Sequence, residues 1–397
     1  MPFRSMTFGD SKMKKMLAAM TALMVCGVAG AQEIDPRARV ALFDPASRVP
    51  DHIGEPVGPA PVTHAYDGVI EPRRIYRIDA NPEAGFHWPY FLHMPEQVPA
   101  GHPVLIEPNN DSLWGAPQET HEYWAAMRNE QLYIDFGRHL ETPMLTPVFP
   151  RPLLDDADGN LYIHALTEPA MTSDDPRLVR PDLQLIAMLD DARSKLAASG
   201  YATSEDALFW GFSAAADFVT RMAVLHPDRV RAVAAGGAGG LPILPLETYV
   251  GETLTYPVGV GNLDVIAGES LNADALRATP VLLYQGGADE NDSVKEPPFS
   301  CEDFGSDSYT CEQAQWVNET FGASTVQRVP LVADIYRDFG MSDFNSIILP
   351  GIEHWTPATM EAAMVGYFAC VIADETGCAS QVEVPDLTAA LERQASR

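Results

Sequence analysis

The stretch Asp206-Ala-Leu-Phe-Trp-Gly211-Phe-Ser213-Ala-Ala-Ala216 decides which fold the sequence predicts. Apolar residues fill a strand-like run up to Phe212, and the chain then passes through Ser213 into a segment with helical periodicity. Small residues flank the serine, with Gly211 two positions before it and Ala215 two positions after it. A nucleophile elbow needs small residues at both places, because its strand and helix approach closely around a strained serine. The stretch therefore predicts that Ser213 is an exposed nucleophile at the end of a strand.

A purely structural interpretation of the same stretch makes Ser213 the N-cap of a helix that follows a buried strand. Ala215 also departs from the usual G-x-S-x-G pattern, although alanine is small enough for that place. The sequence downstream favours the elbow, because His226-Pro227 ends the helix and another apolar strand follows at 230–235.

Short apolar or alternating runs recur along the chain, and helical stretches separate most of the later ones. The expected strands are 68–78, 90–93, 104–106, 144–149, 207–212, 230–235, 281–284 and 346–349, and the clearest helices are 182–198 and 214–226. Strands that alternate with helices indicate a mostly parallel central sheet with helices on both faces. We expect one domain over 68–397, with insertions near 237–277 and 295–312.

A serine hydroxyl is a poor nucleophile at neutral pH, so the elbow requires a histidine base and an acid that orients it. Asp289 follows the expected strand 281–284, and His354 follows the strand 346–349. Each of the three residues stands at the carboxyl end of an expected strand, in the chain order Ser, Asp, His. Taken singly, an aspartate in a turn and a histidine after a strand are common surface residues. Together they indicate a catalytic triad at the sheet edge where such sites lie.

Asp292 is the alternative acid, since it stands three residues beyond Asp289 in the same loop. We favour Asp289, because it follows Gly286 by three residues at the first turn after the strand. A tetrahedral intermediate also needs backbone donors. We expect them from Ala214, which follows the nucleophile, and from Asn110 in the loop after the strand 104–106. The alternative for the Asn110 loop is an Asx-rich turn without a catalytic role.

With these residues the chain resembles the α/β-hydrolase superfamily from about residue 68 to 375. Its general layout is similar to bacterial esterases of the dienelactone-hydrolase or polyhydroxyalkanoate-depolymerase type. The resemblance implies an α/β-hydrolase fold, acyl transfer to Ser213, and hydrolysis of the acyl-enzyme by water that His354 activates. The expected substrates are small or polymeric carboxylic esters, polyesters included, and neither a metal nor an organic cofactor is expected. A serine peptidase or amidase, and a non-catalytic binding protein on the same scaffold, remain alternatives.

The first 31 residues have the pattern of a secretory signal peptide. Lys14 and Lys15 precede an apolar run at 16–28, and Ala29-Gly30-Ala31 follows as a small-x-small cleavage site. A membrane anchor is the alternative, but the run is shorter than the roughly 20 residues that a spanning helix needs. Cys26 leaves lipidation open as a minor alternative. We expect a secreted or periplasmic protein without stable membrane insertion after cleavage, and an extended, proline-rich arm over 32–67.

Four cysteines remain after such cleavage, an even number that predicts two disulfides in an oxidising compartment. The favoured pairs are Cys301 with Cys311 and Cys370 with Cys378, because each pair brackets a polar loop that contains glycine. Metal binding is the alternative, although neither pair has the spacing of a zinc finger. The formal net charge is −29. A protein with so many negative charges repels nucleic acid, so no nucleic-acid partner is expected.

Overall fold

The computed structural model describes residue 56 and residues 58–152, 161–303 and 308–396. The expected signal peptide at 1–31, with Cys26, and most of the expected arm at 32–67 lie outside the described residues.

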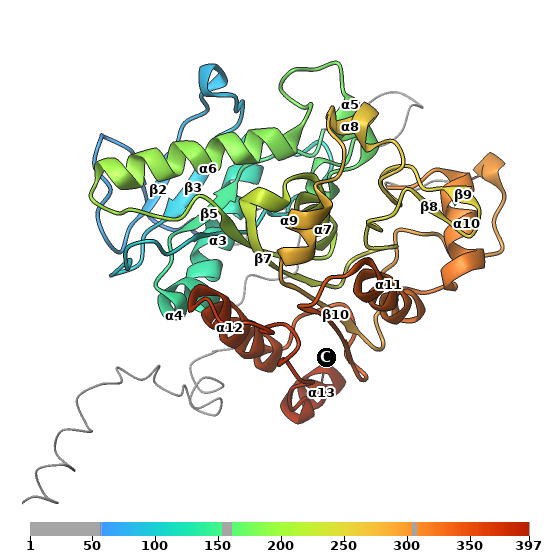
Figure 1. Ribbon diagram of the computed structural model, residues 1–397. Helices are drawn as coiled ribbons and strands as arrows, with labels where there is room; N and C mark the ends of the chain where they lie inside the picture. The colour runs from blue at the N-terminus through green and yellow to red at the C-terminus, as the bar shows by residue number, and fades with distance from the viewer. Residues whose placement is uncertain (1–55, 57, 153–160, 304–307, 397) are drawn as a thin grey trace, which may run out of the picture. The chain divides into compact units, whose positions relative to one another are not determined.

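A nine-stranded sheet organises the described chain, in the order β1-β2-β3-β5-β4-β6-β7-β10-β11 (Figure 1). The strands are β1 (Thr63–Ala65), β2 (Ile75–Ile78), β3 (Tyr90–His93), β4 (Val104–Ile106), β5 (Met144–Pro147), β6 (Ala207–Phe212), β7 (Val230–Gly236), β10 (Val281–Gly286) and β11 (Phe344–Leu349). Strand β3 is antiparallel to β2 and β5, and the other neighbouring strands are parallel. This mostly parallel sheet, with an elbow between β6 and the following helix, is the α/β-hydrolase fold.

Helices cover both faces of the sheet because successive strand residues point to opposite sides. Phe209 of β6 belongs to a core cluster that includes residues of α6 (Pro181–Ala198), α7 (Ala214–Leu225) and α11 (Thr325–Phe339). Leu208 and Trp210 belong to a second cluster, which includes residues of α12 (Ala358–Ile372). Figure 1 shows α6 and α12 on opposite sides of the strands. Helix α3 (Gln118–Leu132) lies along β3 and β5.

Shorter elements fill the connections. They are η2 (Pro82–Ala84), η3 (Tyr133–Gly137), α4 (Arg138–Leu140), η4 (Ile163–Ala165), α5 (Glu168–Thr172), η5 (Pro227–Arg229), β8 (Thr248–Tyr249), β9 (Glu252–Thr253), α8 (Leu263–Ala267), α9 (Ala273–Ala278), η6 (Cys301–Asp303), α10 (Cys311–Phe321) and α13 (Thr388–Ala395). The region 237–277, expected as an insertion, contains the small β8-β9 hairpin and α8.

The first part of the sheet differs from the sequence-based expectation. The strand expected at 68–78 is limited to β2, because Gly68 and Arg73 have positive φ angles of 110° and 60° and Pro72 has no amide proton. Residues of the expected arm instead contribute the edge strand β1, whose Thr63 pairs with Ile75 of β2.

Two disulfides close short loops outside the sheet. Cys301 is joined to Cys311 at the start of α10, and Cys370 of α12 is joined to Cys378, with Cα–Cα distances of 5.5 and 5.7 Å. These are the pairs that the sequence favours, and both distances are ordinary for disulfides. Within the described ranges, no helix combines the length and apolar character that a membrane crossing requires.

Candidate active site

Ser213 occupies a sharp turn between β6 and α7. Its backbone has φ 60° and ψ −128°, a conformation that strains any residue with a Cβ atom. A Cβ atom at position 211 would lie 2.2 Å from the carbonyl oxygen of Ala215, so only glycine fits there. The Ser213 amide donates to the Gly236 carbonyl oxygen of β7 at 2.9 Å. Close packing and this bond together hold the serine at the carboxyl end of the sheet.

The amide of Ala214 opens helix α7. The first amides of a helix have no carbonyl partner within it and are therefore available to an anion. Ala214 belongs to the same cavity lining as Ser213.

Asn110 lies directly against the elbow. Its side-chain Nδ2 donates to the carbonyl oxygen of Phe212 at 3.1 Å, which ties the loop after β4 to the end of β6. The Asx turn weighed from the sequence is also present, since Asn109, with φ 60°, accepts the Asp111 amide at 3.0 Å. The loop is thus an Asx turn that stands next to the elbow.

Arg151 also binds this loop. Its Nη1 donates to the Ser112 carbonyl oxygen and its Nη2 to the Tyr162 hydroxyl, both at 2.7 Å. The guanidinium lies 4.9 Å from the ring centroid of Trp114 and 4.6 Å from that of Tyr162. From the sequence, Arg151 could not be distinguished from a solvated arginine, because its partners lie up to 39 residues away.

His354 and Asp289 form a hydrogen-bonded pair beside the elbow. His354 Nδ1 and Asp289 Oδ2 are 2.8 Å apart, and the aspartate is 6% exposed. Gln285 Nε2 also donates to Oδ2, at 2.8 Å, and the Asn291 amide donates to Oδ1 at 2.9 Å. The His354 ring packs on Phe212 with centroids 4.7 Å apart. The carboxylate is fixed by several donors and in turn fixes the imidazole.

The other nitrogen of His354 contacts an asparagine. Asn291 Nδ2 lies 2.9 Å from His354 Nε2. Ser213 and His354 both belong to the described part of the chain, and no hydrogen bond joins them there. Sequence reasoning gave Asn291 no role at this site, because its partner is 63 residues further along the chain.

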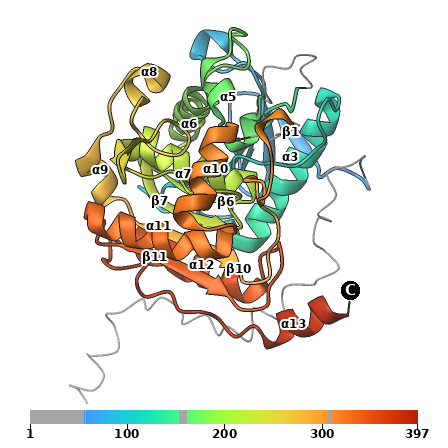
Figure 2. The same ribbon diagram turned by 90° about the vertical axis from the view of Figure 1, so that its right-hand side faces the viewer.

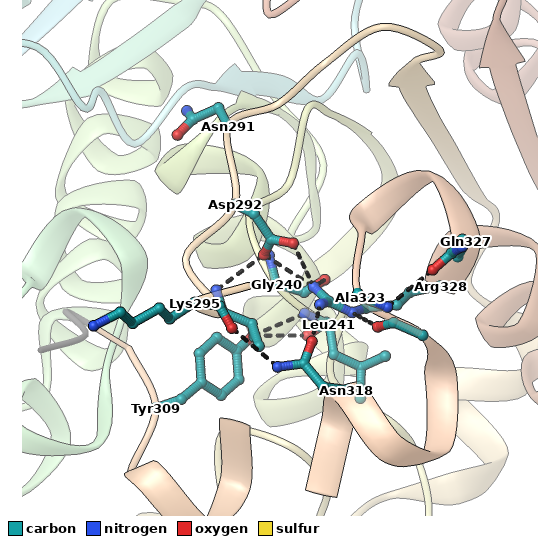
Figure 3. Close-up of polar contacts among 12 residues, drawn as sticks. Gly240, Leu241, Asn291, Asp292, Lys295, Tyr309, Asn318, Ala323, Gln327 and Arg328 are labelled. Carbon is teal, nitrogen blue, oxygen red and sulfur yellow. Dashed lines mark hydrogen bonds and ion pairs between the residues drawn. The ribbon is translucent and has the colours of Figure 1, made fainter. Parts of the chain in front are cut away.

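Asp292 belongs to a different network, in which its carboxylate meets Arg328 (Figure 3). Its Oδ2 lies 2.7 Å from Nη1 of Arg328, a residue with 0% exposure, and its Oδ1 accepts the amides of Gly240 at 3.1 Å and Val294 at 2.9 Å. Asn291 points away from this network in the same view. Asp292 therefore anchors the loop that Asp289 begins.

The loop that carries His354 is fastened by α13, the last helix of the chain (Figure 2). The side chain of Gln394 accepts from the Glu353 amide at 3.0 Å and from Trp355 Nε1 at 2.9 Å, and it donates to the Gly351 carbonyl oxygen at 2.9 Å. The residues on both sides of His354 are thus held by one glutamine.

A cavity of about 280 Å³ opens beside the serine. Its described lining consists of Tyr162, Ala165, Ser213, Ala214, Asp217, Gly239, Asn291, Asp292, Ser293 and Ser308. Burial raises the pKa of Asp217 to about 7, although nearby Arg221 acts in the opposite direction and Asp292 adds to the rise. Across the described residues, no group of three side chains suits a metal ion.

His164 has a role in the core and not in the cavity. It is completely buried, and its Nε2 lies 2.9 Å from the Phe149 carbonyl oxygen. Burial, helped by the positive charge of Arg151, holds the pKa of His164 well below its usual value. The residue is therefore a neutral packing group.

No protein-family model matches the chain, and no curated protein matches it. Among solved structures it is similar to a poly(3-hydroxybutyrate) depolymerase from Bordetella parapertussis, with 18% identity, coverage of 81% of this chain and 94% of that one, and a TM-score of 0.45. A poly(aspartic acid) hydrolase from Sphingomonas sp. KT-1 has 18% identity, coverage of 70% and 91%, and a TM-score of 0.44. Est1E from Butyrivibrio proteoclasticus has 15% identity, coverage of 75% of this chain and 99% of that one, and a TM-score of 0.37.

Proposed function

We propose that this protein is an exported serine hydrolase that cleaves carboxylic esters, with Ser213 as nucleophile, His354 as base and Asp289 as acid. The hydrogen-bonded pair of His354 and Asp289 beside a strained serine is the observation that carries the proposal. These are the parts that acyl transfer to a serine requires.

The reaction begins with a proton transfer. When Nδ1 of His354 donates to Asp289, the lone pair of Nε2 accepts the proton of the Ser213 hydroxyl in place of the hydrogen bond from Asn291. The serine oxygen then attacks the ester carbonyl, and the carbonyl oxygen becomes negatively charged. The backbone amides of Ala214 and Asn110 are the proposed donors to this oxyanion, since both residues lie beside the elbow.

The tetrahedral intermediate collapses when the protonated His354 gives its proton to the leaving alcohol. Water then attacks the acyl-enzyme, with His354 again accepting a proton, and the acid leaves with the serine restored. Asp289 keeps the imidazole oriented and stabilises its cationic form in both halves. The proposal uses neither a metal nor an organic cofactor.

The contacts of the two aspartates support Asp289 as the acid. Asp289 bonds to the imidazole, whereas Asp292 is engaged by Arg328 and by two backbone amides. The two disulfides support export, to the periplasm or the medium, because disulfides persist in oxidising compartments. Polymeric esters belong to the proposed substrates, and nucleic acid does not, since the chain carries a net charge of −29.

A fluorophosphonate probe tests the nucleophile. We expect the probe to label Ser213 in the folded protein, and Ser213→Ala to lose both the labelling and, by on the order of 10³-fold or more, the ester hydrolysis. Ser293→Ala is the matched control, because Ser293 belongs to the same cavity lining. Labelling at another serine, with the alanine variant still active, would refute the proposal.

A comparison of esters with anilides of the same acids separates the proposed esterase from a peptidase or amidase. Faster turnover of the anilides would move the substrate class to amides. Absence of labelling and of turnover on both series would favour the alternative of a binding protein on this scaffold.

A further inference from the structure

We infer that Asp217 selects the substrate, by accepting a hydrogen bond from a hydroxyl or ammonium group that the ester places in the cavity beside Ser213. This inference rests on the proposed function and adds a substrate class to it.

Asp217 lies one helical turn beyond the elbow. Residues four positions apart on a helix are neighbours on one face, and Asp217 and Ser213 are both part of the cavity lining. The aspartate is 3% exposed, and its Oδ1 has no hydrogen-bond partner among the residues that the structure describes. A buried carboxylate oxygen without a donor is unfavourable, and native proteins rarely leave one without a reason.

Arg221, one turn further along α7, is a candidate for an internal partner. Its Nη1 donates instead to the carbonyl oxygen of Ala165, and its guanidinium lies 5.9 Å from the Tyr256 ring centroid. No ion pair joins Arg221 to Asp217 within the described part of the chain. The charge of Arg221 reduces the cost of burying the Asp217 carboxylate without occupying its oxygen.

The other acid of the cavity cannot serve as this acceptor. Asp292 is occupied by Arg328 and by the amides of Gly240 and Val294 (Figure 3). Asp217 is therefore the lining carboxylate whose oxygen remains open to a donor from the substrate.

The rest of the described lining suits a polar group of this kind. Seven of its ten residues carry a hydroxyl, amide or carboxyl group, and none of the ten is a lysine, arginine or histidine. Apolar contacts come from Ala165 and Ala214, which offer little surface to a long alkyl chain. An anionic group would face Asp217 without a cation among the lining residues that the structure describes. Hydroxyl and ammonium groups therefore remain as the matching donors.

Two ester series test the inference, because the donor can stand on either side of the ester. The acyl series compares ethyl butanoate, ethyl 3-hydroxybutanoate and ethyl 3-aminobutanoate. The alcohol series compares ethyl butanoate, 2-hydroxyethyl butanoate and 2-(dimethylamino)ethyl butanoate. We expect kcat/KM for a donor-bearing ester to exceed that for ethyl butanoate by about tenfold or more in at least one series.

Variants at position 217 test whether the Asp217 carboxylate causes the preference for donor-bearing esters. Asp217→Ala should bring the ratio between donor-bearing and plain ester close to one. Asp217→Asn keeps an acceptor oxygen but not the charge, so it should reduce the preference for ammonium more than that for hydroxyl. Asp264→Asn, which removes an exposed carboxylate from α8, should leave both ratios as they are.

The outcomes separate the inference from the proposed function. If fluorophosphonate labels Ser213 and all esters are cleaved without a preference for donors, the inference is wrong and the hydrolase stands. A preference that survives in both Asp217 variants also overturns it. If Ser213 is not labelled and no ester is cleaved, the proposed function fails and the inference falls with it.

Discussion

The side-chain amide of Asn291 donates a 2.9 Å hydrogen bond to Nε2 of His354, the nitrogen on which the proposed reaction depends. A donor at Nε2 is matched by a lone pair on that nitrogen, which places the ring proton on Nδ1, toward Asp289. The same bond occupies the lone pair that accepts the proton of Ser213 in the proposed reaction. In that reaction Asn291 competes with Ser213 for His354.

Replacing Asn291 with alanine should release that lone pair. A typical hydrogen bond contributes about 1 kcal/mol, so we expect the rate of acylation to rise by roughly fivefold at most. Single-turnover kinetics with an activated ester measures this step, and Ser293→Ala is the control for a change in the same lining. A loss of tenfold or more would instead show that Asn291 holds His354 in position.

The close packing at the elbow predicts that Gly211 cannot be replaced by a larger residue. In Gly211→Ala the new methyl group would lie 2.2 Å from the Ala215 carbonyl oxygen, a distance that forces the strand and helix apart. We expect a lower melting temperature and loss of fluorophosphonate labelling. Gly366→Ala is the matched control, because the same methyl group meets no atom within 4 Å in α12 and should be neutral or stabilising by up to about 1 kcal/mol. Equal labelling of both variants would contradict the elbow argument.

The sequence predicts the central strands well, because their signal is local. Strands β3, β4 and β6 begin and end at the expected residues, since each is a run of apolar side chains buried in the sheet. Strand β2 is shorter than expected because backbone conformations around Arg73 override its alternating pattern. The elbow can likewise be predicted from local sequence, because the small residues that it needs lie within two positions of Ser213.

The contacts that distinguish the site residues are not local. Asp289 and Asp292 look alike in the sequence, and the difference lies in their partners, His354 and Arg328, which are 65 and 36 residues away. The same holds for Gln394, which meets the loop of His354 across about forty residues. A pattern of neighbouring residues contains no information about such pairs.

Gln394 should influence catalysis without touching the substrate. Its three hydrogen bonds hold Gly351, Glu353 and Trp355, so Gln394→Ala should loosen the loop and lower kcat by about tenfold or less, with KM less affected. Glu392→Ala changes an exposed residue of the same helix and is the control. If kcat stays the same while only the melting temperature falls, Gln394 has a purely structural role.

Glu107 makes stability depend on pH. Burial raises its pKa from 4.5 to about 8, with Arg128 opposing the rise and Asp111 and Asp135 adding to it. The unfolded chain loses this proton near pH 4.5 and the folded chain only near pH 8, so between these values the folded state binds more protons. The free energy of unfolding therefore falls as the pH rises through this window and is constant above it.

Glu107→Gln should remove the contribution of Glu107 to this slope, at most about 1.4 kcal/mol per pH unit, and leave that of Asp217, whose pKa burial raises to about 7. Urea unfolding at pH 7.0 and 8.0 measures how the free energy of unfolding changes with pH. Burial lowers the pKa of His93 and of His121 to about 4, so both pH values lie above the range in which these histidines take up protons. Glu119→Gln, an exposed change on α3, is the control. An unchanged slope in Glu107→Gln would show that Glu107 is ionised in the folded protein.

The last prediction separates the two aspartates by what each variant loses. Asp289→Asn keeps the shape of the side chain, but it replaces one carboxylate oxygen with an amide donor and removes the charge that stabilises protonated His354. We therefore expect kcat to fall by up to about 10⁴-fold, with KM little changed. Asp292→Asn leaves the buried guanidinium of Arg328 without its charged partner, which should destabilise the protein by about 3–5 kcal/mol. Its kcat, measured well below the lowered melting temperature, should stay within about tenfold of the original protein. If Asp292→Asn abolished turnover in folded protein and Asp289→Asn did not, the acid would be Asp292, and the pair of Asp289 and His354 would be structural.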